Sequence, residues 1–358
     1  AGVRVYVACI PLQLLLGMSL LSAILLFVGV SLVYTYVGGI KAVIWTDAVQ
    51  FLLFAAGGVF TVCYIPQLFD GGFVEAFGMA ARAGKLHWLN LHFSWAMPFN
   101  LWMGLIGATV QVLCSHGAEQ LIVQRVLTCR DVGDGRKALM LSAGLIFPLF
   151  LVFLLAGAML WVYYQQVPMA MPMPQIRPGI GRNDYVFPIF ILTAVPSPVR
   201  GFLIVAILSA AMSSVSSALS ALASVSTMDF FKAWGMGGRS EDFYLRFSKY
   251  STVGWAVALV VVADLSRQVE FVLNTAFSLR GLTSGGLLGG LLLAVWARRG
   301  RSAPVVIGMA SSLAVMIVID TAWKDEIAWP WYTLIGVVVT LTVATAARST
   351  LEPRMPMT

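Results

Sequence analysis

This chain contains long runs of apolar residues. Short glycine-rich, polar or basic stretches separate these runs from one another. A helix needs about 20 residues to cross the roughly 30 Å hydrocarbon core of a bilayer. Runs close to that length predict about ten membrane-spanning helices. The predicted spans are residues 1–17, 20–38, 42–65, 97–117, 138–164, 199–228, 250–265, 270–296, 303–320 and 329–347.

Composition supports a membrane environment. Hydrophobic residues make up 59% of the 358 positions, charged residues only 11%, and the mean hydropathy is +0.87. This balance excludes an ordinary soluble domain and predicts that the lipid bilayer is a partner. The formal charge of +7 does not predict a nucleic-acid partner, because the basic residues cluster between spans rather than along a stripe with aromatic residues.

The distribution of basic residues predicts the topology. Pairs such as Arg136–Lys137 and Arg298–Arg299 fall on the same side of the alternating loops. The positive-inside rule makes that side cytoplasmic, so the C-terminus is expected on the cytoplasmic side. The membrane is expected to be a bacterial inner (plasma) membrane. The connectors 66–98 and 165–198 are then external, and they are expected to form short amphipathic helices or ordered loops. We expect a single transmembrane domain over residues 1–358.

Polar groups inside apolar spans are candidate functional residues, because an ionised side chain in hydrocarbon costs several kcal/mol. Asp47 lies one or two turns into a predicted span, where it is either an interfacial carboxylate near Lys41 or part of a cation relay. In the segment 208–231, the hydroxyls of Ser213 and Ser214 follow Ala210 by three and four residues. They either bond back to the helix or turn, with the Ala210 carbonyl, toward a bound Na⁺.

Three stretches of this chain resemble the sodium/solute symporter family. They are YTYVGGIKAVIWTDAVQ, then EQLIVQRVLTCRD, then SAAMSSVSSALSALASVSTMDFF. The resemblance implies an all-α polytopic membrane protein with a leucine-transporter-like inverted-repeat helix bundle. It also implies sodium-coupled secondary active symport by alternating access, with Na⁺ as the coupling ion and no further cofactor. On this match Ala210, Ser213 and Ser214 bind sodium, and Asp47 is the coupling aspartate.

The beginning of the chain departs from the family pattern. Ala1 opens directly onto the apolar stretch Val3 to Leu16, with no charged segment before it, which predicts a helix cut open rather than a signal peptide. The first and second core helices of the family would lie before Ala1. Since the first core helix supplies further sodium ligands, the chain as given is expected not to transport by itself.

The solute is predicted from charges inside the spans. The family's sugar transporters place asparagine and tyrosine where this chain has Val112 and Ser115, which disfavours a sugar. Arg4 and Arg280 lie within spans, and a guanidinium can bind a carboxylate with two hydrogen bonds. A carboxylate or amino acid is therefore favoured. The predicted solute-binding residues are Arg4, Gln111, Ser115, Arg280 and Thr283.

Each arginine also has a structural alternative. Arg4 could face a cytoplasmic vestibule, and Arg280 could pair with Asp264, Glu270 or a helix carbonyl. A second structural interpretation concerns the glycines of the 270–296 span, which are spaced for close helix packing rather than for a phosphate loop. These glycines are Gly281, Gly285, Gly286, Gly289 and Gly290.

Other classes of protein are weighed against the symporter. A membrane-embedded enzyme would need a nucleophile, a metal cluster or paired acids at one depth, and His87, His92 and His116 do not provide this arrangement. The prediction is therefore that the protein is not an enzyme. A sodium-conducting channel and a solute-sensing membrane domain remain as alternatives, and a channel would conduct sodium without solute.

Overall fold

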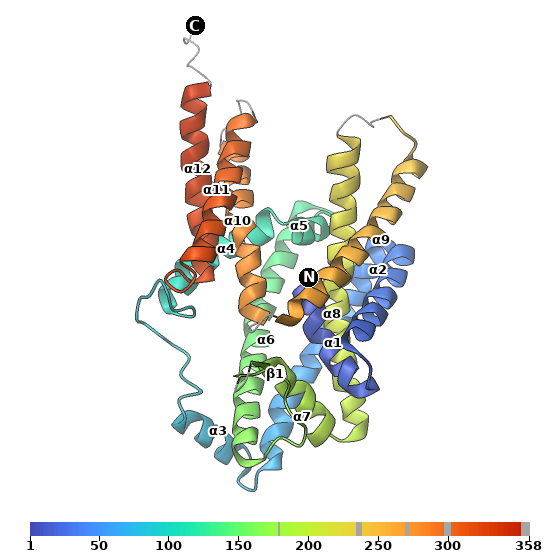
Figure 1. Cartoon of the computed structure of the whole chain (residues 1–358), viewed down its shortest axis with the longest axis vertical. Coiled ribbons are helices and arrows are strands. Elements are labelled where there is room, and N and C mark those ends of the chain that lie inside the picture. Colours follow the sequence, from blue (N-terminus) through green and yellow to red (C-terminus); the bar gives the residue numbers. More distant parts are fainter. Residues whose placement is uncertain (178–179, 234–237, 269–271, 297–301, 352–358) are drawn as a thin grey trace. The chain divides into compact units, whose positions relative to one another are not determined.

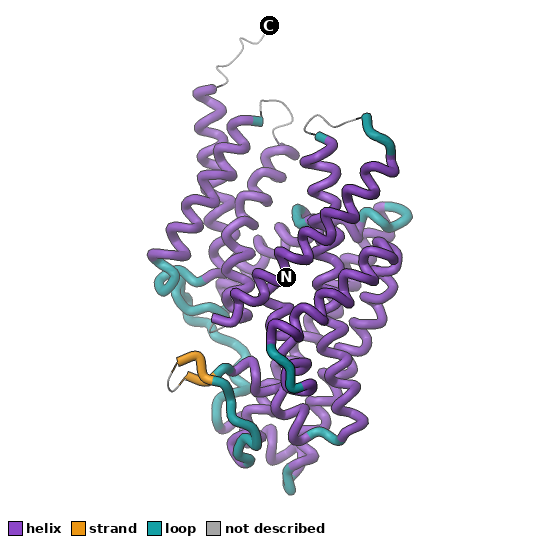
Figure 2. Tube along the Cα trace, turned by 45° about the vertical axis from the view of Figure 1, so that its right-hand side comes forward, coloured by secondary structure: helices purple, strands orange, loops and turns teal. Residues whose placement is uncertain are grey.

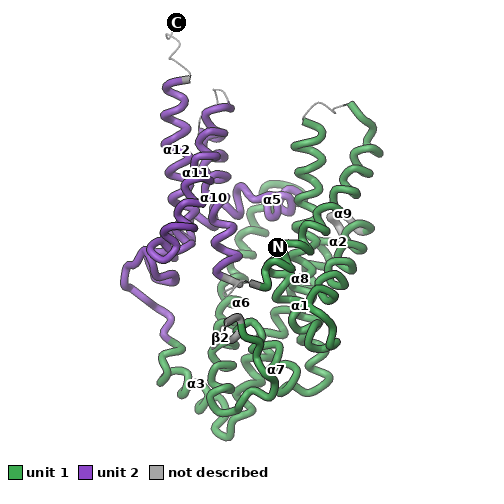
Figure 3. The backbone as a smooth tube through the Cα atoms, viewed as in Figure 1, with its two compact units in different colours: residues 1–86, 128–272 green, residues 87–127, 273–358 purple. Residues whose placement is uncertain are grey.

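The computed structural model describes residues 1–177, 180–233, 238–268, 272–296 and 302–351. Helices dominate this part of the chain, and one small antiparallel hairpin joins β1 (Gln175–Arg177) to β2 (Ile180–Gly181) (Figure 2). Internal contacts divide the chain into two compact units (Figure 3). Unit 1 comprises residues 1–86 and 128–272, and unit 2 comprises residues 87–127 and 273–358.

Within the described residues, eight helices are long and apolar enough to cross a membrane. They are Leu20–Val37, Val43–Leu68, Val132–Gln166, Ser197–Lys232, Glu241–Leu265, Asn274–Trp296, Ala303–Ala322 and Trp329–Thr350. Two predicted spans are shorter in the structure. Helix α1 (Gly2–Leu16) has 15 residues, and the 97–117 span is replaced by the π-helical segment η2 (Met103–Ala108) and the short helix α4 (Thr109–Gly117).

Asn100 explains why the helix predicted over residues 97–117 starts late. Its side-chain amide donates to the carbonyl oxygens of Ser94 and Met97, at 3.0 Å each, and its Oδ1 accepts from the backbone N–H of Met103 at 2.8 Å. The side chain thus satisfies polar groups of a non-helical turn and caps the following helix. Residues 97–100 therefore precede the helix, which shortens the span.

Unit 1 is a bundle of long helices with short helices in the segments that connect them (Figure 1). Its elements are α1, α2 (Leu20–Tyr64), η1 (Ile65–Leu68), α3 (Gly72–Arg82), α6 (Val132–Gln166), β1, β2, η3 (Asn183–Tyr185), α7 (Val186–Ala194), α8 (Ser197–Val225), η4 (Ser226–Lys232), α9 (Glu241–Leu265) and η5 (Ser266–Gln268). Helix α8 packs along α1, α2 and α9. The candidate sodium residues therefore lie on a helix that is enclosed by others.

Helix α2 does not run straight along α8. The Tyr34 hydroxyl donates to the carbonyl oxygen of Met212 at 3.1 Å, whereas Gly57 packs against Leu203 and Ala206. In a straight helix Tyr34 and Gly57 would be about 35 Å apart, but Leu203 and Met212 are separated by only about 14 Å along α8. The chain therefore turns back between Tyr34 and Gly57, as two separate predicted spans require.

Helix α7 lies inside the connector 165–198, where a short helix or an ordered loop is expected. It buries Pro188, Ile189, Phe190 and Ile191. Phe190 and Ile191 belong to one hydrophobic cluster with residues of η1, α3, α6 and α8. Nine residues are too few to span a bilayer, so hydropathy over a span-length window does not detect this helix.

The chain leading into α7 is attached to α1 by two side-chain hydrogen bonds. Arg182 Nη1 donates to the Tyr6 hydroxyl at 2.9 Å, and the Tyr185 hydroxyl donates to Gln13 Oε1 at 3.2 Å. Burial raises the pKa of Asp184, and the neighbouring Arg182 guanidinium opposes that shift. Residues 182–185 of the connector are thus an ordered part of unit 1.

Unit 2 contains η2, α4, α5 (Gln120–Val126), α10 (Val272–Trp296), α11 (Ala303–Ala322), η6 (Trp329–Trp331) and α12 (Tyr332–Leu351). Close contacts at the glycines of α10 hold it together. A Cβ added at Gly285 would lie 2.5 Å from Gly336 Cα, and one at Gly289 would lie 2.6 Å from Thr340 Cβ, both on α12. Gly286 and Gly290 face Met309 of α11. The prediction that these glycines serve helix packing is confirmed.

Candidate functional site

The hydroxyl-rich stretch of α8 is continuous helix through Ala210, Ser213 and Ser214. The Ser213 carbonyl oxygen accepts from Ser216 Oγ at 3.1 Å and from Ser217 Oγ at 2.6 Å. Back-bonding of this kind satisfies hydroxyls within a membrane helix. Hydroxyl bonding back to the helix, the alternative to sodium binding, is therefore seen at Ser216 and Ser217. These two residues lie one turn after the candidate sodium residues.

Ser214 makes a different contact. Its Oγ accepts a hydrogen bond from Arg4 Nη1 on α1 at 3.4 Å, across 210 positions of sequence. Arg4 is exposed and Ser214 is half-buried. The sequence predicts separate roles for these residues, solute binding for Arg4 and sodium binding for Ser214. The structure brings the two together in unit 1.

Asp47 lies on α2, which packs against α8 in the same unit. The residue is half-buried, and both of its carboxylate oxygens are buried. The side chain of Lys41, its expected neighbour in the interfacial alternative, lies outside the described residues. A buried carboxylate in an apolar helix needs a compensating positive charge or several donors.

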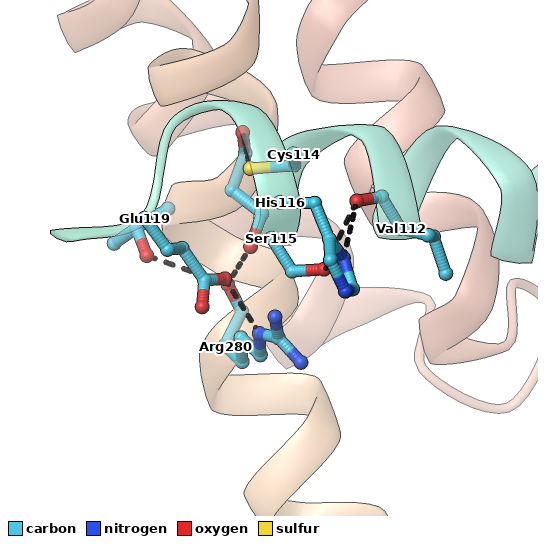
Figure 4. Close-up of polar contacts among 8 residues, drawn as sticks. Val112, Cys114, Ser115, His116, Glu119 and Arg280 are labelled. Atoms are coloured by element: carbon cyan, nitrogen blue, oxygen red, sulfur yellow. Dashed lines mark hydrogen bonds and ion pairs between the residues drawn. The ribbon is translucent and has the colours of Figure 1, made fainter. Parts of the chain in front are cut away.

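The remaining predicted solute residues belong to unit 2, with Gln111 and Ser115 on α4 and Arg280 and Thr283 on α10. Figure 4 shows Ser115 near the end of α4 and the ion pair of Arg280 with Glu119. Arg280 Nε donates to Glu119 Oε1 at 2.6 Å, and the two side chains are 29% and 21% exposed. Of the partners considered for Arg280, Asp264 pairs with Arg267 and Glu270 lies outside the described residues. Within the described residues, the ion-pair partner of Arg280 is therefore Glu119 rather than Asp264.

The polar neighbours of this ion pair are engaged mainly within their own helices. Ser115 Oγ donates to the Val112 carbonyl at 3.0 Å and lies 2.9 Å from His116 Nδ1. Thr283 is exposed, and its Oγ1 donates to the Arg280 carbonyl at 3.3 Å. Gln111 Nε2 is buried and has no hydrogen-bond partner within the described part of the protein. Gln111 therefore has the donor that a bound solute could use.

Two further residues at these places were missed by sequence reasoning as site residues. Glu119 lies two residues after Gly117, the last residue of α4, and its partner Arg280 is 161 positions away. Tyr34 contacts the α8 backbone beside Ser213, and no local pattern distinguishes it from other interfacial tyrosines. Both contacts are made across long sequence separations.

These features define a class of protein. A bundle of membrane-spanning helices that holds a buried carboxylate, a hydroxyl-rich helix and an intramembrane ion pair is typical of secondary transporters. The family model described as "Sodium:solute symporter family" matches residues 2–310. The chain belongs to the sodium/solute symporter family, as the three sequence stretches predict.

Individual relatives agree with this assignment. The chain is 28% identical to the sodium/sialic acid symporter NanT of Aliivibrio fischeri, over 94% of its own length and 66% of NanT. It is also 28% identical to the sodium/sialic acid symporter SiaT of Proteus mirabilis, over 92% of its length and 66% of SiaT. A rabbit (Oryctolagus cuniculus) sodium-dependent multivitamin transporter is 28% identical over 87% of the chain and 48% of that protein. The chain thus spans slightly less than two thirds of the two bacterial relatives.

A solved structure shares the fold. It is a substrate-bound, outward-open state of a Na⁺-coupled sialic acid symporter, with a TM-score of 0.81 and 24% sequence identity. The match covers 99% of this chain and 72% of the other. The all-α polytopic, leucine-transporter-like fold is confirmed. The relatives named here are transporters by description.

Proposed function

We propose that the protein is a sodium-coupled secondary active symporter for a small organic solute that carries a carboxylate, either an organic acid or an amino acid. The observation that carries the proposal is the contact of Arg4 with Ser214. In this contact a guanidinium, a group that can bind a carboxylate, lies beside Ser214, one of the candidate sodium ligands, within one unit. The names of the two bacterial sialic acid symporters support an acidic solute.

In this proposal the Ala210 carbonyl and the hydroxyls of Ser213 and Ser214 bind the coupling ion. Na⁺ is a hard cation that prefers such oxygen ligands. Asp47 supplies the buried negative charge that favours cation entry. On the solute side, Arg4 binds the carboxylate, while Gln111, Ser115 and Thr283 remain candidates for a polar pocket that belongs to unit 2.

The Arg4–Ser214 contact also gives a physical route for coupling. A guanidinium close to Ser214 Oγ repels a cation at the same oxygen, so sodium binding and this hydrogen bond disfavour each other. Sodium occupancy would release Arg4 to a solute carboxylate. Coupling is then a difference in solute affinity between sodium-free and sodium-bound states, and it is expressed in alternating access.

The same proposal includes the setting of the protein. Both units together form one transporter domain, and the family match, which runs through both of them, supports this. The bilayer surrounds the protein in a plasma membrane of bacterial type, with the C-terminus in the cytoplasm. The bacterial relatives and the cytoplasmic excess of Lys and Arg support that orientation.

The experiment that tests the function is uptake by the full-length protein in proteoliposomes, with and without an inward sodium gradient. Labelled organic acids, amino acids and sugars are offered in separate reactions. Sodium-dependent accumulation of an acid or an amino acid is the expected result. Sodium flux that needs no solute would instead identify a channel, and accumulation of sugar alone would contradict the assigned role of Arg4.

A first prediction concerns the sodium residues. The double substitution Ser213→Ala and Ser214→Ala is expected to raise the sodium concentration for half-maximal uptake by about tenfold or more, since each removes one oxygen ligand. Sodium titration of initial uptake measures the effect. Ser220→Ala, also on α8, is the matched control and should leave the titration unchanged. Unaltered sodium dependence of the double variant would remove both serines from the site.

A further inference from the structure

In unit 2, the helical path is interrupted between α4 and α5. Helix α4 ends at Gly117, and Glu119 has an extended backbone with φ −80° and ψ 121° before α5 begins at Gln120. Helix α5 has seven residues, none of them buried. A helix of this length has little stability of its own, so its position depends on the contacts at its start.

The break lies at the depth of the membrane rather than at its surface. Arg280, the partner of Glu119, is six residues from the beginning of the candidate span Asn274–Trp296, or about 9 Å along the helix axis. Glu119, which pairs with Arg280, lies at a similar depth. Charged residues at such a depth almost always pair with one another, and they mark functional places.

The α10 side of the pair is held by close contacts with α12 and α4. Gly285, one turn beyond Arg280, packs directly against the Gly336 backbone of α12. Cys114 Sγ donates to the Ser284 carbonyl at 3.1 Å, and Ser284 Oγ donates to the Arg280 carbonyl at 2.7 Å. The last turn of α4 is thus attached to α10 through Cys114, and the residue between α4 and α5, Glu119, is attached to α10 through the ion pair (Figure 4).

We propose that Glu119 and Arg280 form a positioning pair that fixes the start of α5 against α10 and so controls the movement of α5 during transport. Arg280 is held by the protein's own carboxylate, and it acts through α5 rather than by binding solute. The position of α5 follows from the ion pair alone, whereas its effect on turnover rests on the proposed symport function.

The first test measures the position of α5 without any transport. A reporter cysteine is introduced by Leu121→Cys, a residue that is 37% exposed on α5, after Cys63 and Cys129 have been replaced by serine. Its alkylation rate is measured in the full-length protein in liposomes. Glu119→Gln and Arg280→Gln should each raise the rate about tenfold, because each leaves an uncompensated charge or a lost contact at the break.

The charge-reversed pair, Glu119→Arg with Arg280→Glu, should restore the rate to near that of the unaltered pair. The control is Lys137→Gln, which breaks the ion pair between Lys137 and Asp134. These side chains are 81% and 45% exposed, so this change should leave the alkylation rate unaltered. Unchanged alkylation in both glutamine variants, or a double variant no better than the singles, would overturn the positioning role. Neither result depends on sodium-driven uptake.

The second test separates positioning from solute binding. A positioning pair predicts that Glu119→Gln and Arg280→Gln lower the maximal uptake rate to a similar extent, with the solute KM changed less than threefold. If Arg280 bound solute directly, Arg280→Gln would raise KM strongly, while Glu119→Gln would lower it by freeing the guanidinium. That opposite pair of shifts would overturn the proposal.

Discussion

Gly285→Val is expected to prevent unit 2 from folding normally. A Cβ at this position would lie 2.5 Å from Gly336 Cα, 2.7 Å from its carbonyl carbon and 2.8 Å from the Thr333 carbonyl oxygen. These are backbone atoms, so α10 and α12 can only move apart. Overpacking of this kind costs about 1–3 kcal/mol for side-chain clashes and more where backbones are forced apart. The measurement is the thermal unfolding midpoint in detergent, together with the yield of monodisperse protein.

The control for this substitution is Gly144→Val on α6, where an added Cβ has no neighbour within 4 Å. Valine has a better intrinsic helix propensity than glycine, so this change should leave the midpoint unaltered or slightly raised. Gly285→Ala should be intermediate, because it introduces the clash without the two methyl groups. An unfolding midpoint for Gly285→Val equal to that of the unaltered protein would contradict the close contact of α10 with α12.

Asp47→Asn is expected to produce the largest functional loss among single substitutions. The two carboxylate oxygens of Asp47 are buried in α2, and replacing the carboxylate by an amide removes the negative charge while keeping the shape. Removing one partner of a buried charge pair costs about 3–5 kcal/mol, and in the proposed function the partner of Asp47 is the coupling cation. Even the lower figure corresponds to about a hundredfold change in rate or affinity. We therefore expect sodium-driven uptake to fall by about a hundredfold.

Initial uptake rates over a range of sodium concentrations measure this loss, with surface expression and the unfolding midpoint determined in parallel. Asp70→Asn is the matched control, because Asp70 is an exposed carboxylate in the connector that follows η1. It should transport like the unaltered protein. Sodium dependence retained by Asp47→Asn would show that Asp47 belongs to the protein–lipid interface, as the alternative interpretation holds.

Most of the membrane-spanning helices could be predicted from the sequence, because lipid restricts the available structures. Backbone polar groups in hydrocarbon must be satisfied inside the segment, so an apolar run of sufficient length becomes a helix. Close helix contact was predictable at Gly285 and Gly289 for a related reason. Because glycine has no side chain, two membrane helices can approach closely at these positions. In the structure, α10 contacts Gly336 and Thr340 of α12 at Gly285 and Gly289.

Shorter elements were less predictable. Helix α7 is apolar but only nine residues long, and it is buried by the surrounding cluster of unit 1 rather than by lipid. The 97–117 segment begins its helix late, because Asn100 completes a turn through its side chain. Hydropathy averages over a window, so neither a short buried helix nor a single side-chain cap changes the average enough to be detected.

The sequence by itself determined that charges such as Arg280 and Asp47 stand inside apolar helices, where leaving them unpaired is costly. Only the tertiary structure decided the partners. Glu119 lies 161 positions from Arg280, and Ser214 lies 210 positions from Arg4. The energy of such a contact depends on the distance between two groups and on their burial, and both are set by how distant helices pack rather than by any local pattern.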